Sequence, residues 1–154
     1  MSLKVYKVRS NTIPDPDMPG RRYHTALFVQ NTDNDEGTIH QVTGDLVTGM
    51  TYEVKRAQRP EDSQDFHDKE LLGTVEPSQY PAFFDQICRQ QPPPPKQKKF
   101  NLATRRTEQT KSDGSFYAPG EQKAPMIKCT EWTELQAIPA LIKAGILKMQ
   151  GSEL

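Results

Sequence analysis

The sequence predicts an α+β fold in which a small antiparallel sheet packs against helices. The first half of the chain contains short runs rich in β-branched and apolar residues, separated by polar turn segments. The second half contains two amphipathic patterns with apolar residues at three- and four-residue spacing, which is typical of helices. The length of 154 residues suits one domain, 1–154, with a buried core.

The first half of the chain predicts a series of strands. The run at 3–8 alternates between polar and apolar residues, and YHTALFV (23–29) is apolar and β-rich. A polar turn separates this second run from TIHQVTG (38–44), so the two are expected to form a β-hairpin. Two further strands are expected at 46–54 and 70–75. The turn-rich connector 10–20 and the charged segment 55–68 are expected to be irregular.

Two helices are predicted in the second half. The first covers 77–91, with Ser78 as its N-cap, and the four prolines that follow it end the helix. The second covers 130–149, and Pro139 inside it is expected to kink or divide it.

A long Pro-rich and basic loop is predicted at 92–125, between the two helices. Loops of this length without secondary structure are uncommon in compact domains and are usually functional or disordered. Because the loop leads directly into the last helix, we expect it to cover a substrate cleft there. Phe116 and Tyr117 are the aromatic residues expected to lie over an apolar acyl group.

The composition argues against several classes of protein. Acidic and basic residues balance at 20 each, whereas a dedicated nucleic-acid or anionic-membrane binder shows a strong basic excess. The sequence contains no run resembling a signal peptide or a membrane helix, so a cytoplasmic location is expected. Cys88 and Cys129 are its two cysteines and are expected to be thiols, with a single disulfide as the alternative.

No cofactor and no metal site is predicted, because the chain lacks the HExxH, paired CxxC, P-loop and GxGxxG motifs. His67 lies among the carboxylates of Asp65, Asp68 and Glu70, a pattern that fits either loose metal binding or a solvated charged loop.

Cys129 is the residue whose position is most informative. It stands directly before the last predicted helix, where a thiolate faces the positive end of the helix dipole and free backbone N–H groups. These features lower the pKa of a cysteine, and the same N–H groups can stabilise an oxyanion. The alternative is an inert cysteine at a helix start.

Two of the three histidines, His24 and His40, lie on the two strands of the predicted hairpin. Their positions differ by an even number, so both side chains share a face of the sheet if the hairpin register is also even. The helix that begins near Cys129 must bury its apolar side against such a face. This arrangement would supply a thiol, a base for it and a partner for the base. The alternative is a half-buried His24 and an exposed His40.

The segments YHTALFV (23–29) and KCTEW (128–132) resemble motifs of the circularly permuted branch of the NlpC/P60 superfamily, which includes lecithin-retinol-acyltransferase-like enzymes and permuted papain-fold peptidases. The resemblance implies a circularly permuted papain-like fold with Cys129 as nucleophile, His24 as base and His40 as its orienting partner. Lys128 stands where the family motif usually has asparagine. The whole chain is also similar to fungal proteins of similar length, which implies no function.

From these observations we expect a cysteine-dependent hydrolase or acyltransferase. It would act on an amide, ester or thioester of a small-molecule or peptide substrate through an acyl-enzyme. The backbone N–H of Cys129 would contribute to the oxyanion site, with Tyr23 and Gln41 as candidates for the second donor. Two alternatives remain open: a non-catalytic binding module of the same fold, with the basic 96–111 stretch as its candidate surface, and a structural or interaction protein in which Cys129 is core.

Overall fold

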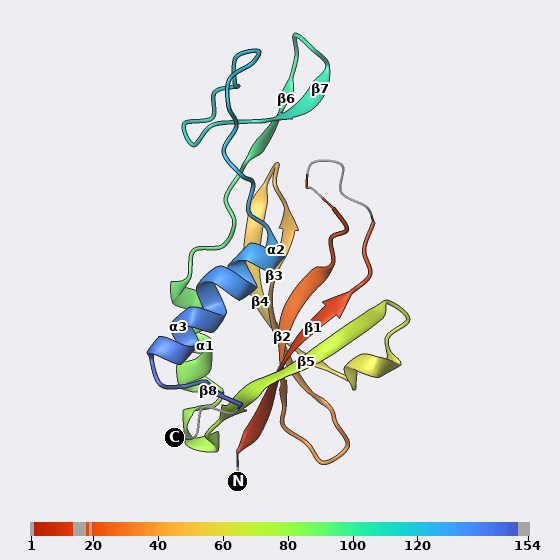
Figure 1. Cartoon of the computed structure of the whole chain (residues 1–154), viewed down its shortest axis with the longest axis vertical. Helices are drawn as coiled ribbons and strands as arrows, with labels where there is room; N and C mark the ends of the chain where they lie inside the picture. The colour runs from red at the N-terminus through yellow and green to blue at the C-terminus, as the bar shows by residue number, and fades with distance from the viewer. Residues whose placement is uncertain (1, 14–17, 19, 151–154) are drawn as a thin grey trace.

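A computed structural model of the chain describes residues 2–13, 18 and 20–150. Its centre is a six-stranded antiparallel sheet in the order β4-β3-β2-β1-β5-β8, with the helices on one side of it (Figure 1). A separate two-stranded hairpin, β6-β7, projects from one end of the molecule. The predicted α+β class is therefore confirmed.

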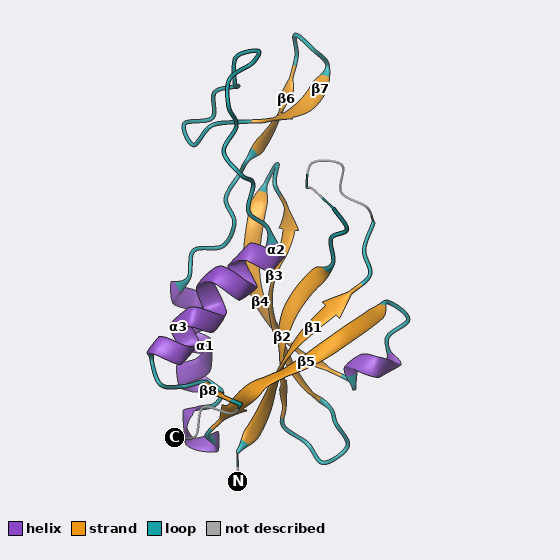
Figure 2. Ribbon diagram, viewed as in Figure 1, coloured by secondary structure: helices purple, strands orange, loops and turns teal. Residues whose placement is uncertain are grey.

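Figure 2 distinguishes the helices from the strands. The strands are β1 Leu3–Ser10, β2 His24–Gln30, β3 Gly37–Asp45, β4 Gly49–Ala57, β5 Phe66–Val75, β6 Lys98–Asn101, β7 Arg106–Gln109 and β8 Lys148–Met149. The helices are α1 Ala82–Gln90, α2 Cys129–Glu131 and α3 Ile138–Lys143, with a π-helical stretch Trp132–Ala137 joining α2 to α3 and 3-10 turns at Pro60–Asp62 and Pro77–Gln79.

The register of the β2–β3 hairpin is set by its turn. Gln30 pairs with Gly37 at the turn, and Leu27 pairs with His40 further along. Gly37 permits this pairing because a Cβ atom on it would lie 2.0 Å from the carbonyl oxygen of Val29, closer than any side chain can approach. Because Leu27 and His24 are an odd number of residues apart, His24 faces the opposite side of the sheet from Leu27 and His40.

The core lies between the sheet and the helices. Val5, Leu27 and Val42 of the sheet are fully buried, and so are Trp132 and Leu141 of the last helix. On β2, Leu27 and the residues an even number of positions from it therefore face the helices, whereas His24 lies on the other face of the sheet.

The last helix runs from Cys129 to Lys143, not to 149 as predicted. Gly145, with a φ of +76°, ends it, and the N–H of Ile146 donates to the carbonyl of Leu141 at 3.0 Å, as in a Schellman-type end. A π-helical stretch precedes Pro139, which cannot donate a backbone hydrogen bond. The wider turn also changes which side chains are buried, so Leu135 is 71% exposed.

The first predicted helix, 77–91, is divided. Residues Pro77–Gln79 form a 3-10 turn, and the α-helix begins only at Ala82, with Pro81 rather than Ser78 at the N-cap position. Proline is favoured at the start of both segments because its missing N–H has no helical partner there. The segment 55–68 is also less irregular than predicted, since β4 extends to Ala57 and β5 begins at Phe66.

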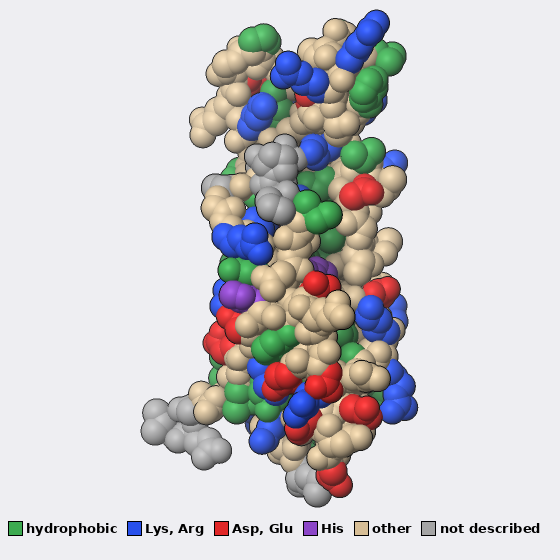
Figure 3. Space-filling model, turned by 90° about the vertical axis from the view of Figure 1, so that its right-hand side faces the viewer, with side chains coloured by type: hydrophobic (Ala, Val, Ile, Leu, Met, Phe, Trp, Pro, Cys, Tyr) green, Lys and Arg blue, Asp and Glu red, His purple; other side chains and the backbone are tan. Residues whose placement is uncertain are grey.

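The segment 92–125 is not a structureless loop, because it contains the β6–β7 hairpin. The side chain of Gln97 closes its neck by donating to the carbonyl of Ile127 and accepting from its N–H, both at 2.8 Å. We name residues 97–127 the arm. Figure 3 shows several Lys and Arg side chains on one face of the arm. None of the helices in the described part of the chain has the length and apolar character needed to span a bilayer.

Candidate functional site

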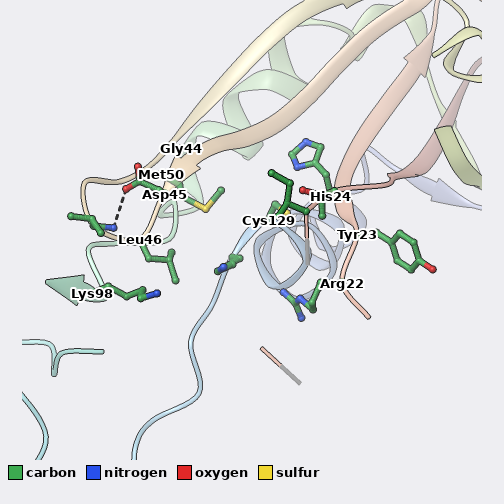
Figure 4. A pocket seen from close by; sticks show the side chains of 13 residues that line it. Arg22, Tyr23, His24, Gly44, Asp45, Leu46, Met50, Lys98 and Cys129 are labelled. Carbon is green, nitrogen blue, oxygen red and sulfur yellow. Dashed lines mark hydrogen bonds between the residues drawn. The ribbon is translucent and has the colours of Figure 1, made fainter. Parts of the chain in front are cut away.

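Cys129 and His24 lie side by side at the end of the sheet nearest the arm (Figure 4). Cys129 is the first residue of α2, and His24 is the first residue of β2. The thiol and the imidazole interact, because each shifts the pKa of the other. The structure thus brings together two of the three residues that the sequence singled out.

The start of the last helix is anchored by Glu131. The Lys128 N–H donates to the Glu131 carboxylate at 2.8 Å, which satisfies a donor at the N-terminus of the helix. Arg22 binds the two oxygens of the same carboxylate, each at 2.8 Å, and so ties the segment before β2 to the helix. The Thr25 and Thr130 hydroxyls are 2.9 Å apart and form a further link between β2 and the helix. These contacts hold Cys129 beside His24.

The partner of the His24 ring is Gln41 and not, as was expected, His40. His24 Nε2 lies 2.6 Å from Gln41 Oε1, and Gln41 Nε2 donates to Glu53 Oε1, also at 2.6 Å. Gln41 and Glu53 pair directly across β3 and β4. The side chains of His24, Gln41 and Glu53 therefore form a continuous chain of hydrogen bonds across β2, β3 and β4, and Cys129 lies beside the His24 end of it.

The electrostatics of the pair favour a charged thiolate and imidazolium. The hydrogen bond to Cys129, together with its charge, raises the pKa of His24 despite the opposing effect of burial. Burial alone would raise the pKa of Cys129, but the hydrogen bond and charge of His24, with the N–H of Thr25, lower it overall. Cys129 is thus a stronger acid and His24 a stronger base than usual, and both changes favour a thiolate–imidazolium pair.

His40 does not take part in this group, which corrects the expectation that it lies next to His24. Because His40 pairs with Leu27 rather than with a residue on the face of His24, its ring lies on the helix side of the sheet, where it is fully buried. His40 Nδ1 lies 2.7 Å from the Tyr52 hydroxyl, and His40 Nε2 lies 2.9 Å from the Tyr80 hydroxyl. The ring also packs on Phe84, with centroids 4.7 Å apart.

The partners of His40 define a buried polar network. The Tyr52 hydroxyl donates to Asp85 at 2.9 Å, so it accepts from His40 Nδ1–H, and His40 Nε2 accepts from Tyr80. Burial lowers the pKa of His40 to about 4, so the ring is neutral at neutral pH. This network joins β3 and β4 to α1 and its preceding turn.

A cleft of about 390 Å³ opens beside Cys129 and His24 (Figure 4). Leu46, in the β3–β4 turn, and Met50, near the start of β4, provide an apolar wall opposite the thiol. Lys98, at the base of the arm, and Lys128 also line it. Phe116 and Tyr117 do not line this cleft, so the prediction that they cover it is wrong. Tyr117 instead accepts a hydrogen bond from the Ala124 N–H at 3.1 Å within the arm.

Neither residue left open as a second oxyanion donor faces the thiol with a free donor group. The Gln41 amide is engaged at both ends, by His24 and by Glu53. The Tyr23 ring stacks on His67 with centroids 4.0 Å apart and points away from Cys129 in Figure 4. Throughout the described ranges, no group of three or more His, Cys, Asp or Glu side chains suits a metal ion, the surroundings of His67 included.

Cys88 differs sharply from Cys129, although both are free thiols. It is fully buried against the core, and burial raises its pKa to about 12. Cys129 is partly exposed at the cleft. The chain therefore carries one accessible and one inaccessible thiol, which serves as an internal reference for labelling.

Sequence reasoning missed Gln41 as the partner of His24. No sequence signal marks Gln41, because its place depends on the register between β2 and β3 and on the close approach of Gly37 to Val29. With that register, Gln41 is the β3 residue on the same face as His24 and diagonal to it.

Comparison with known proteins gives a family and nothing more specific. A family of unknown function (DUF6540) matches residues 11–148, a range that includes every residue of the hydrogen-bonded chain described above. No curated protein and no solved structure matches the chain.

Proposed function

The chain belongs to the family of unknown function DUF6540, and from the geometry of its site we propose that it is a cysteine-dependent hydrolase or acyltransferase. The observation that carries the proposal is the adjacent pair Cys129–His24, which opens onto a cleft and whose imidazole is hydrogen-bonded to Gln41. A thiol, an imidazole and an amide in this order are also the parts of the Cys-His-Asn site of papain-like proteases.

Each residue has a distinct role in the proposed reaction. The Cys129 thiolate attacks the carbonyl carbon of an amide, ester or thioester, and the carbonyl becomes an oxyanion. His24 then gives its proton to the leaving group as the carbon–heteroatom bond breaks, which leaves an acyl-enzyme thioester. His24 next takes a proton from water, an amine or an alcohol, which attacks the thioester and releases Cys129. Gln41 holds the ring of His24 through both steps.

The order of the parts along the chain supports a circularly permuted papain-like fold as the finer structural proposal. The base lies on an early strand, and the nucleophile begins a late helix packed on the same sheet. The size of the cleft and its apolar wall of Leu46 and Met50 suit a small acyl group or a short peptide segment.

Labelling of the two thiols tests the proposal. With iodoacetamide at mildly acidic pH, Cys129 should be alkylated quickly, because an ordinary thiol with pKa of about 8.5 is nearly all protonated there. Cys88 should remain unlabelled in the same sample, and His24→Ala should slow labelling of Cys129 by tenfold or more, roughly. With p-nitrophenyl acetate, mass spectrometry should find an acetyl group on Cys129 that is lost in water.

Two results would separate the alternatives. Slow labelling of Cys129, unaffected by His24→Ala, would support a binding module or a structural protein instead of an enzyme. Fast labelling with no acetyl adduct would show a reactive thiol that does not perform acyl transfer.

A further inference from the structure

The bonds of the Gln41 amide determine which nitrogen of His24 carries the proton. Glu53 offers a carboxylate, which can only accept hydrogen bonds, so the NH₂ end of Gln41 must face Glu53. The carbonyl end then faces His24, and it can bind Nε2 only if that nitrogen carries a proton. Nδ1 is consequently the nitrogen left for the Cys129 thiol, and it is the one that can receive a proton from it.

We propose that Glu53 is a positioning residue for the Cys129–His24 pair and acts through the Gln41 amide. It lies on β4, the edge strand of the sheet, and pairs directly with Gln41 in register. Its contact with Gln41 is 2.6 Å long, as short as the contact of Gln41 with His24. This inference rests on the proposed function, and it adds a residue that touches neither the thiol nor the imidazole.

Glu53 is the contact that fixes the orientation of the Gln41 amide, because the other side-chain partner of the amide, His24, can either donate or accept. A rotated amide would present NH₂ to Nε2, which must then be unprotonated to accept the bond. The imidazolium would lose an acceptor and gain a competing donor, so the ion pair with Cys129 would be weakened. A carboxylate acting through one intermediate group in this way is comparable to the outer partners that orient metal-binding histidines.

The effect of the Glu53 charge must be separated from its effect on the orientation of Gln41, because the Glu53 carboxylate also neutralises Lys55. Lys55 Nζ lies 4.0 Å from Glu53 Oε1, and its charge lowers the pKa of His24. The charged groups near the pair are Glu53 and Lys55 on β4, Glu131 on α2, and Arg22, Asp45, Lys98 and Lys128 at the cleft. Removing Glu53 therefore changes both the field at His24 and the orientation of Gln41.

The pH dependence of Cys129 alkylation by iodoacetamide distinguishes these effects. In the intact protein, the rate should rise at the apparent pKa at which the ion pair forms. In Glu53→Leu, the rise should shift to higher pH, and the rate at mildly acidic pH should fall about tenfold, the worth of one charge-assisted hydrogen bond. Glu53→Gln removes the charge but keeps an acceptor for Gln41, so it should retain most of the rate.

Two further variants complete the experiment. Gln41→Leu should shift the profile as Glu53→Leu does, and the double variant should be no slower than Gln41→Leu alone, since both act along one path. Glu70→Leu, at an exposed carboxylate of β5 that pairs with Lys7, is the matched control and should keep the original profile. Glu53→Thr replaces Glu53→Leu if the apolar side chain on an edge strand causes aggregation.

Each result bears on one proposal. If the intact protein alkylates Cys129 no faster than an ordinary thiol, the proposed function fails. If Cys129 is reactive but Glu53→Leu keeps the original profile, only the role of Glu53 fails. Equal losses in Glu53→Gln and Glu53→Leu would show that the charge acts directly, which also overturns positioning through Gln41.

Discussion

His40 is fully buried and has a hydrogen-bond partner on each ring nitrogen. Both partners are tyrosine hydroxyls, and the direction of the Tyr52 bond toward Asp85 makes the neutral ring the fitting form. If Nε2 of His40 were protonated, it could donate to the Tyr80 hydroxyl only after that hydroxyl had rotated to become the acceptor. The side chain that the sequence placed in the catalytic group therefore serves the core.

Acid should destabilise the protein through His40. Its folded pKa of about 4 is below the ordinary value of 6.5, so the stability it contributes is complete above 6.5 and is lost as the pH falls toward 4. Between neutral pH and about pH 4.5 the loss should be roughly 2 kcal/mol, because only the unfolded chain takes up the proton. Urea unfolding of the protein and of His40→Leu at both pH values measures it.

The control for this measurement is His67→Gln. His67 lies at the surface stacked on Tyr23, and its replacement should leave the acid-dependent loss as it is in the intact protein. His40→Leu should be less stable at neutral pH, since the Tyr80 hydroxyl loses its partner, yet it should lose less on acidification. An equal acid loss in His40→Leu would show that other groups cause it.

At the scale of elements, the β2–β3 hairpin determines which residues can meet. Its turn spans residues 31–36, and Gly37 lies against the Val29 carbonyl on the facing strand. This close approach holds Leu27 opposite His40, and with it His24 diagonal to Gln41 on the other face. A shift by one residue would exchange the faces of every β3 side chain relative to β2.

Gly37→Ala should therefore damage both the fold and the site. The added methyl group would lie 2.0 Å from the Val29 oxygen and 2.9 Å from the Phe28 ring, so the strands must move apart. We expect a loss of roughly 2 kcal/mol in the free energy of unfolding and slower alkylation of Cys129. Thr51→Ala, at an exposed position of β4, is the control and should change neither. A fully stable Gly37→Ala protein would contradict the account of the register.

At the scale of the whole molecule, the arm and the sheet contribute unequally to the site. Between residues 96 and 128 there are 8 Lys and Arg residues but 3 Asp and Glu, although the chain as a whole is neutral. The arm joins the sheet at Gln97, whose backbone N–H donates to the Leu46 carbonyl at 2.7 Å. Among its residues up to Ile127, Lys98 alone is part of the cleft lining.

Excision of most of the arm tests this division. Replacing 99–126 with a short Gly-Ser linker keeps Lys98 and the Gln97–Ile127 contact that closes the neck. The shortened protein should keep its sheet signal in circular dichroism and its fast alkylation of Cys129. Loss of folding would show that the arm belongs to the core. Slower alkylation of a folded protein would restore the idea that this segment covers the cleft.

The sequence by itself determined the parts of this protein that depend on local pattern. The strand that begins at His24 and the helix that begins at Cys129 follow from residues adjacent in the chain, through β-branched runs and apolar spacing. That pattern also led to the prediction that the Cys129 thiol and the His24 imidazole lie together, as they do in the structure. It missed the end of the last helix at Lys143, because the π-helical stretch and Gly145 alter the spacing that a regular helix would keep.

Only the tertiary structure decided which side chains lie next to the Cys129–His24 pair. Whether His24 meets His40 or Gln41 depends on one residue of register between β2 and β3, and periodicity within a strand cannot reveal it. The register follows from the fit of Gly37 against a carbonyl on another strand, and the contact of Glu53 with Gln41 follows from β4 lying beside β3. Contacts between strands are set by how the whole sheet packs, so they are absent from any local stretch of sequence.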